Sequence, residues 1–365
     1  FYKTENGKVS FYDFDTKSYK EVVVSESNIS LAALKGSGKL VKTCDSASLV
    51  DLGDGVFCCE FHTKMNALNA EIIQFMDEAM DYVDENGVGL VIGNQAGGMP
   101  GAFSAGADLV QVGTAAKTNR LDEVDQMIRA LHAVIQKETY SPFPVVAAPY
   151  GLALGGGCEV CLAADRIVAH AELYMGLVEV GVGLLPGGGG CKNLWKKAVN
   201  SIPSHVKDVD LTKFFIPTFM NIATAKVSMS AAQARAAGFL GPQDRIVFNR
   251  DLLIGEAKKE VLRMADAGYA PPAKKKLKVL GAAAEGMVNG EIFNMQSAGY
   301  VSEYDAFLAR RIATVVGGGD VRTNSEIDEE VILNLEREAF IDFLKQEKTL
   351  ARIEHMLKTG KPLRN

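Results

Sequence analysis

The sequence predicts a layered α/β fold, because short apolar strands alternate with amphipathic helices along the first half of the chain. Residues 47–61 show the pattern of two strands that turn at Gly53-Asp54-Gly55. Further apolar segments at 88–93, 144–148 and 166–169 are predicted to be strands. Helical segments lie between most of them, which is typical of a sheet covered by helices.

The helices are indicated by apolar residues that recur at the helical period. One helix is expected to begin near Leu68 and to end near Asn86-Gly87, and another to run from about 120 to 138. Residues 159–164 are predicted to form a short buried helix that ends at Asp165-Arg166. These helices provide the covering layer of the predicted sheet.

The second half of the chain is predicted to be mostly helical. Residues 230–238 begin with a serine suited to an N-cap and end with a glycine. Longer helices are expected at 251–267 and 325–346, and the second begins with Ser325-Glu-Ile-Asp328, which resembles a capping box. Two segments show no pattern that places them: 192–229 and 268–324.

The composition argues against several classes of protein. The formal net charge of −6 and the pI near 5.6 disfavour a nucleic-acid-binding surface. No apolar run reaches the roughly 18 residues of a membrane span and no signal-like segment opens the sequence, so a cytoplasmic location is expected. Cys158-Glu-Val-Cys161 has no second pair and the histidines are scattered, so buried thiols are favoured over a metal or redox site.

Two glutamates occupy positions where a carboxylate is costly. Glu159 follows three glycines and a cysteine, Glu179 stands 20 residues later, and apolar or glycine residues surround both. Burial raises the pKa of a carboxyl group unless hydrogen bonds hold its charge. Either outcome suits acid–base chemistry, although a glutamate that pairs with an arginine or caps a turn is the structural alternative.

Glycine-rich turns near these glutamates predict a site for negative charge. The segment from Gly151 to Gly157 leads into the predicted short helix, whose first N–H groups have no partner within the helix. We expect this segment to form half of an oxyanion hole, a pair of N–H groups that stabilises charge on an oxygen atom. The other half is expected from residues 101–109, which follow the predicted strand at 88–93.

Three segments together resemble the crotonase (enoyl-CoA hydratase/isomerase) superfamily in order, spacing and residue type. They are Phe103-Ser-Ala-Gly-Ala-Asp-Leu109, Gly151-Leu-Ala-Leu-Gly-Gly-Gly-Cys-Glu159, and Glu179 with the following Gly181-Val-Gly-Leu-Leu-Pro-Gly-Gly-Gly-Gly190. The resemblance implies an α/β fold with a crotonase-type spiral of β-β-α repeats at 46–240. It also implies a helical C-terminal region at 241–365.

The resemblance implies a trans-2-enoyl-CoA hydratase of fatty-acid β-oxidation, which adds water across the 2,3 double bond. It places Ala107 and Gly156 as the oxyanion-hole donors, Glu159 as the base for water, and Glu179 as the proton donor to Cα. The presence of both glutamates favours a hydratase. Two alternatives stay open: an enoyl-CoA isomerase of the same fold, for which Glu159 would be dispensable, and a catalytically silent CoA-binding or scaffold domain.

An acyl-CoA thioester is the implied substrate, so coenzyme A arrives with it and no separate cofactor is expected. The resemblance implies that the Ala105 backbone contacts the adenine and that Lys64 is a candidate partner for a phosphate. An exposed lysine without a specific role is the alternative for Lys64. Gly155 and Asp108 are the other candidate substrate-contacting residues, although a structural role in capping the next turn is favoured for Asp108.

Residues 1–45 are expected to be a linker or the remnant of a preceding domain. They begin with Phe1 and show a hairpin pattern that turns at Asn6-Gly7. They resemble the join in proteins that fuse a 3-hydroxyacyl-CoA dehydrogenase to a crotonase module, so a fused N-terminal dehydrogenase is the expected partner. Any use of NAD would belong to that dehydrogenase. Relatives are commonly trimers, so a homo-oligomer is a further expectation.

Overall fold

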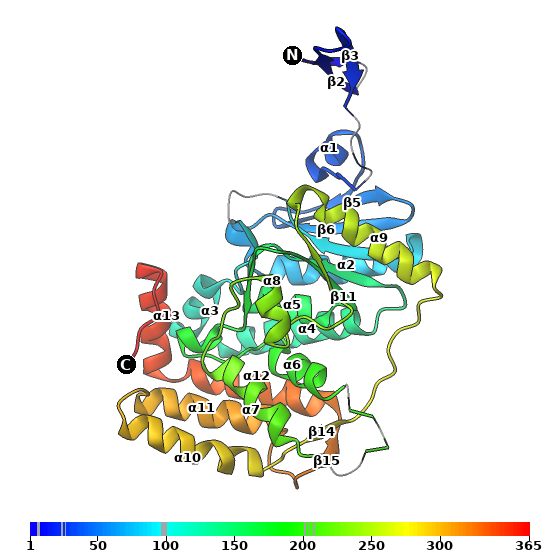
Figure 1. Cartoon of the computed structure of the whole chain (residues 1–365). Helices are drawn as coiled ribbons and strands as arrows, with labels where there is room; N and C mark the ends of the chain where they lie inside the picture. Colours follow the sequence, from blue (N-terminus) through cyan, green and yellow to red (C-terminus); the bar gives the residue numbers. More distant parts are fainter. Residues whose placement is uncertain are drawn as a thin grey trace.

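A twisted sheet of mostly parallel strands forms the centre of the molecule (Figure 1). The computed structural model describes residues 1–5, 8–22, 25, 27–95, 101–200, 202–203, 205–206 and 209–365. Within this described part, the larger sheet has seven strands in the order β13 (Arg245–Val247), β11 (Arg166–His170), β9 (Val145–Ala148), β7 (Gly89–Gly93), β6 (Val56–Phe61), β5 (Ala47–Gly53) and β4 (Leu40–Thr43). The pairs from β6 to β13 are parallel, whereas β4, β5 and β6 pair antiparallel.

A second, parallel sheet consists of β8 (Ala102–Ser104), β10 (Gly151–Leu154) and β12 (Leu173–Gly176). Consecutive strands alternate between the two sheets, so that β7 precedes β8, β9 precedes β10 and β11 precedes β12. Helices follow each pair of strands. This arrangement confirms the predicted spiral of β-β-α repeats.

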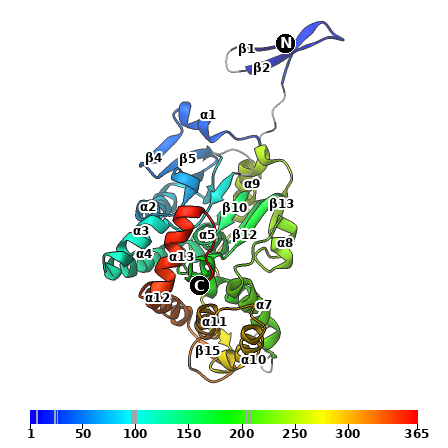
Figure 2. The ribbon, with the colours of Figure 1, turned by 90° about the vertical axis from the view of Figure 1, so that its left-hand side faces the viewer.

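Helices cover both faces of the larger sheet (Figures 1 and 2). The helices around the sheets are α1 (Leu31–Gly36), α2 (Ala70–Asn86), α3 (Leu109–Lys117), α4 (Leu121–Thr139), α5 (Gly156–Ala163), α6 (Gly190–Val199), α7 (Thr212–Ala223), α8 (Ala231–Ala236) and α9 (Leu253–Asp266). Alternate residues of a strand point to opposite faces, and in β7 Val91 packs with α9 while Leu90 and Ile92 pack with α2 and α4. The strands are apolar on both faces because both faces are buried.

The amphipathic patterns predicted the core helices closely. The helix expected from Leu68 to Asn86 is α2, and its first turn is closed by the Asn69 side chain, which accepts the Ile72 N–H at 2.8 Å. The segment 192–229, in which no pattern indicates an element, contains α7 and most of α6 (Gly190–Val199). None of the helices in the described part of the chain is long and apolar enough to cross a membrane.

Elements on both sides of residues 46–240 pack against the larger sheet. Before it, Leu31 is fully buried and β4 pairs with β5. After it, β13 pairs with β11, and α9 packs on the sheet. The two edge strands of the larger sheet, β4 and β13, therefore lie outside residues 46–240.

A small antiparallel sheet at the N-terminus projects away from this core (Figure 2). It consists of β1 (Tyr2–Glu5), β2 (Lys8–Asp13) and β3 (Ser18–Glu21). The expected hairpin corresponds to β1 and β2, although its turn at Asn6-Gly7 lies outside the described residues.

The C-terminal region is helical, as expected, and packs beneath the spiral (Figure 1). It contains α10 (Ala283–Ser297), α11 (Glu303–Val316), α12 (Glu329–Leu344) and α13 (Glu347–Thr359). The capping box predicted at Ser325 is wrong, because residues 325–327 form strand β15, which pairs with β14 (Leu277–Val279). A capping box exists instead at Ser302 and Asp305, where α11 begins.

A glutamate in the core of the molecule has a carboxyl group without a hydrogen-bond partner among the described residues. Glu138 of α4 is fully buried, and neither carboxyl oxygen has a hydrogen-bond partner in the described part of the chain. Burial, reinforced by the negative charge of Asp165, raises the pKa of Glu138 well above its ordinary value. The folded chain therefore keeps a proton that the unfolded chain releases above about pH 4.3.

Replacing Glu138 by methionine should stabilise the protein. Below about pH 4.3 Glu138 is protonated in both the folded and the unfolded chain. As the pH rises from there towards the raised pKa of Glu138 in the folded chain, only the unfolded chain releases the proton, and the free energy of unfolding decreases. The variant avoids that loss, so its free energy of unfolding should exceed that of the unsubstituted chain by about 1–3 kcal/mol at about pH 8 and by less at about pH 5. Urea unfolding at both pH values measures the difference. An equal gain at both pH values would show that Glu138 does not change its protonation on unfolding.

Candidate active site

Two backbone turns meet where neighbouring parallel strands of the smaller sheet end. β8 leads to Gly106-Ala107, and β10 leads to Gly155-Gly156 at the start of α5. Gly106 and Gly155 have φ values of +99° and +52°, which side-chain-bearing residues rarely adopt. A Cβ atom placed on Gly156 would lie 3.6 Å from the Ala107 nitrogen, so the two predicted N–H donors lie side by side.

The hydrogen bonds around these turns leave both N–H groups available. Leu68 donates to the Gly106 carbonyl at 2.8 Å and accepts the Asp108 N–H at 2.9 Å, so the N–H of Ala107 between them faces the other way. Gly156 is the first residue of α5 and has no acceptor within the helix. Neither N–H donates to an acceptor within the described ranges. Such a pair suits an oxygen that gains negative charge.

Glu159 lies one turn into α5 and is 3% exposed. Its Oε1 atom accepts the N–H groups of Gly188 and Gly190 at 2.7 and 2.8 Å. Burial raises the pKa of Glu159 to about 7, and the two N–H groups oppose this rise by stabilising the ionised form. A carboxyl group with such a pKa is suited to accept a proton near neutral pH.

Glu179 begins a short 3-10 helix, η2 (Glu179–Val182), after β12. A Cβ atom on Gly155 would lie 2.8 Å from its Oε1, so this carboxyl group reaches the turn that carries the Gly156 N–H. Its Oε2 atom is buried without a hydrogen-bond partner in the described chain. Burial, followed by the negative charge of Glu159, raises the pKa of Glu179 well above its ordinary value. Glu179 therefore holds its proton more strongly than an exposed glutamate does.

The candidate substrate-contacting residues adjoin this site. The Ala105 N–H donates to the Met65 carbonyl at 3.1 Å. That contact places the short helix η1 (Lys64–Asn66), and the exposed Lys64, next to the β8 turn. Gly155 lies at the start of α5, next to the Glu179 carboxyl group. Asp108 caps α3 by accepting the Val110 N–H at 2.9 Å. Asp108 thus has the structural role that the sequence also allowed.

The nearby Cys-x-x-Cys pair is structural. Cys158 and Cys161 are fully buried, and burial raises the pKa of both thiols well above the ordinary value. They are therefore protonated and unreactive at neutral pH. Among the described residues, no group of three or more histidine, cysteine, aspartate or glutamate side chains is arranged to hold a metal ion.

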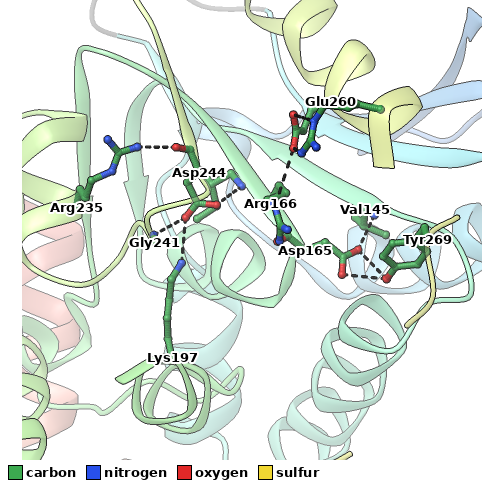
Figure 3. Close-up of polar contacts among 11 residues, drawn as sticks. Val145, Asp165, Arg166, Lys197, Arg235, Gly241, Asp244, Glu260 and Tyr269 are labelled. Carbon is green, nitrogen blue, oxygen red and sulfur yellow. Dashed lines mark hydrogen bonds and ion pairs between the residues drawn. The ribbon is translucent and has the colours of Figure 1, made fainter. Parts of the chain in front are cut away.

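Polar contacts at the far end of α5 hold the surrounding strands (Figure 3). The Asp244 carboxylate accepts the Ile167 N–H of β11 at 2.8 Å and the Lys197 ammonium group of α6 at 3.2 Å. Asp165, just after α5, accepts the Val145 N–H of β9 at 2.9 Å. These contacts join the end of α5, α6 and two strands of the larger sheet. They therefore help to hold α5, the helix that contains Glu159, in place.

The sequence reasoning missed a third buried carboxyl group, that of Glu336 in α12. It is fully buried and accepts the Gly189 N–H at 2.9 Å and the Lys192 N–H at 2.6 Å. A signal for it existed, because Glu336 lies three residues after Leu333 and four before Phe340, on the apolar face of the predicted helix. A charged residue on such a face is unusual.

Comparison with known proteins places this fold and site in a family. Residues 53–206 match the enoyl-CoA hydratase/isomerase family. The chain is 42% identical over 365 residues to the probable 3-hydroxyacyl-CoA dehydrogenase of Bacillus subtilis (strain 168), across 100% of this chain and 45% of that protein. It is 31% identical over 199 residues to the probable enoyl-CoA hydratase of Rhizobium meliloti (strain 1021), across 53% of this chain and 66% of that protein.

A crystal structure of an enoyl-CoA hydratase from Mycobacterium avium subsp. paratuberculosis K-10 shares the fold, with a TM-score of 0.54 and 19% identity, over 86% of this chain and 100% of that one. The chain belongs to the crotonase (enoyl-CoA hydratase/isomerase) superfamily. It spans less than half the length of the Bacillus subtilis protein.

Proposed function

We propose that the chain catalyses the hydration of trans-2-enoyl-CoA thioesters to 3-hydroxyacyl-CoA. One observation carries this proposal: two buried carboxyl groups of different pKa lie beside two N–H groups that have no acceptor in the described chain. Hydration of a conjugated thioester needs a base for water, an acid for Cα and a donor pair for the thioester oxygen. The arrangement of Glu159, Glu179 and the two N–H groups supports one candidate for each of these roles.

The oxyanion hole would act on the charge that builds up during water addition. As the water oxygen bonds to Cβ, the electrons of the double bond move towards the thioester carbonyl, whose oxygen becomes negative. The N–H groups of Ala107 and Gly156 would stabilise that oxygen, and one such donor is typically worth about 2.7–4 kcal/mol of the barrier. Their backbone is fixed before substrate arrives, so little reorganisation is required.

The two carboxyl groups would divide the proton transfers. Glu159, with its pKa of about 7, would take a proton from the attacking water. Glu179, whose pKa lies well above its ordinary value, would deliver its proton to Cα. Glu159 ends the reaction protonated and Glu179 ionised, and proton exchange with solvent restores both. The difference in pKa therefore favours the same assignment that the family resemblance implies.

An enoyl-CoA isomerase is the second candidate function, and a catalytically silent CoA-binding domain is the third. An isomerase needs a group that moves a proton between carbon atoms, which Glu179 could do without Glu159. The hydrogen bonds from Gly188 and Gly190 to Glu159 favour the hydratase, because they orient a second carboxyl group that an isomerase would not use. A silent domain has no use for either.

The wider biochemical setting follows from the proposed reaction. Coenzyme A would enter with the substrate, and the chain itself would need no separate cofactor. A relative that covers the whole of this chain is named a 3-hydroxyacyl-CoA dehydrogenase, and the proposed product is a 3-hydroxyacyl-CoA. We therefore propose that a dehydrogenase, which would use NAD, is fused to this module in the full protein. A role in β-oxidation, a cytoplasmic location and a homo-oligomer belong to the same proposal.

The pH dependence of hydration tests the proposed roles. The rate at low substrate concentration should increase as the pH rises through about 7, because Glu159 must be ionised to accept a proton. It should decrease again at higher pH as Glu179 loses its proton. The loss of enoyl-thioester absorbance from crotonyl-CoA and a longer trans-2-enoyl-CoA measures the rate. A wild-type chain that binds these esters without changing the absorbance would contradict the proposed function.

A further inference from the structure

The glycine turn between Leu185 and α6 is held from both sides by carboxyl groups. Its N–H groups alternate in direction: those of Gly188 and Gly190 donate to Oε1 of Glu159, and that of Gly189 donates to Oε2 of Glu336 at 2.9 Å. The turn therefore links the proposed base to a residue of the C-terminal region.

Glu336 also closes the start of α6. Gly189 is the N-cap of this helix, and a glycine has no side chain with which to satisfy the first N–H groups. Glu336 supplies that cap from α12, because its Oε1 accepts the Lys192 N–H at 2.6 Å while its Oε2 accepts that of Gly189. A helix N-terminus favours a carboxyl group there.

The packing on both sides confines the turn. A Cβ atom on Gly188 would lie 2.7 Å from Oε2 of Glu159, and one on Gly187 would lie 2.7 Å from the Phe340 ring of α12. Gly189 has a φ of +95°, which is strained for other residues. The turn thus fits between α5 and α12, and its position depends on the acceptors at both sides.

We infer that Glu336 is a positioning residue for Glu159: by holding the Gly189 and Lys192 N–H groups, it keeps the Gly188 and Gly190 N–H groups directed at the proposed base. This role rests on the proposed hydration for its catalytic consequence, although its structural part does not. Without Glu336, the turn would relax and the ionised form of Glu159 would lose donors. The C-terminal region would then be part of the machinery that sets the basicity of Glu159.

Several titratable groups face this cluster and must be considered in any test. Glu179 approaches from η2, Cys191 and Lys192 from α6, and His132 from α4, where its Nε2–H donates to the Gly187 carbonyl at 2.7 Å. Burial lowers the pKa of His132 to about 4, so it is neutral over the range of interest. Burial and then the charge of Glu159 raise the pKa of Glu336 well above its ordinary value. Removing negative charge at Glu336 would by itself lower the pKa of Glu159, so a rise in that pKa in the glutamine variant reports the loss of N–H donors.

The substitution Glu336→Gln tests the inference, since an amide has only one oxygen to accept the two N–H groups. For crotonyl-CoA we expect kcat to fall at least about 10-fold while KM changes less than about 2-fold. The pH at which the rate is half-maximal should rise by about one unit. Glu338→Gln, an exposed change on the same helix, is the matched control and should leave all three values unchanged.

A measurement that needs no turnover separates this inference from the proposed function. The pKa of Glu159 can be followed by NMR of carboxyl-13C-labelled glutamate, with Glu159→Gln to assign the signal. Glu336→Gln should raise that pKa even if the wild-type chain hydrates no enoyl-CoA. If the glutamine variant does not fold, Glu336→Asp should show the same rise to a smaller extent. An unchanged Glu159 pKa in a folded variant would overturn the inference. A fall in rate that is explained entirely by a higher KM, with kcat unchanged, would also overturn it.

Discussion

Replacing Glu179 by glutamine is expected to lower the hydration rate of crotonyl-CoA by about 10²- to 10⁴-fold. Glutamine matches glutamate in size but has no proton to deliver to Cα. Oε2 of Glu179 has no hydrogen-bond partner in the described chain, so the substitution breaks no contact of that atom. The variant should therefore fold and bind CoA esters as the wild-type chain does. Initial rates from the decrease in enoyl-thioester absorbance, together with binding of a saturated acyl-CoA, separate the two effects.

Glu172→Gln is a suitable control for this variant. Glu172 lies just before β12, only partly buried, and its carboxylate accepts the Tyr174 hydroxyl at 3.1 Å, outside the proposed site. Its substitution should change the rate less than about 2-fold. A Glu179→Gln variant that keeps most of its activity would remove Glu179 from the mechanism.

Replacing Glu159 by glutamine should have a comparable effect, about 10²- to 10⁴-fold, through the opposite proton transfer. The amide oxygen can still accept the N–H groups of Gly188 and Gly190, so the turn should keep its place. What is lost is a group that can take a proton from water. The rate should consequently lose its increase through about pH 7, where Glu159 ionises in the wild-type chain.

This variant also distinguishes the two candidate reactions. If the chain is an isomerase, conversion of a 3-enoyl-CoA to the conjugated 2-enoyl-CoA should survive Glu159→Gln and fail in Glu179→Gln. If it is a hydratase, both variants should lose hydration. Full hydration by Glu159→Gln would contradict the assignment of Glu159 as the base.

Local patterns predicted the parts of the fold that local physics decides. The helix α2 was predicted from its regular apolar period alone, a pattern that lies within one short segment of the sequence. The strand β15 escaped prediction because residues 325–327 pair with β14, almost 50 residues earlier, and this pairing outweighs a cap-like sequence. Helix α10 escaped for a different reason, since it contains Gly286 and Gly290 and has no clear apolar face.

The same division applies to the site. Glu159 and the glycine-rich segments 101–109 and 151–157 could be singled out because such patterns are visible in short stretches of sequence, whereas the choice of Ala107 and Gly156 came from the family resemblance. Glu336 could not be assigned a partner, because it lies 147 residues from Gly189 and no motif relates the two. Tertiary packing alone brings α12 to the turn.

The central claim is that the chain adds water to a conjugated enoyl thioester, and isotope incorporation tests this most directly. Wild-type chain, Glu159→Gln and Glu179→Gln should each be incubated with crotonyl-CoA in water enriched in 18O, and the products analysed by mass spectrometry. The account predicts 3-hydroxybutanoyl-CoA that carries one 18O atom with the wild-type chain, and almost none with either variant. Recovery of unchanged crotonyl-CoA from the folded wild-type chain, or equal incorporation by all three chains, would contradict it.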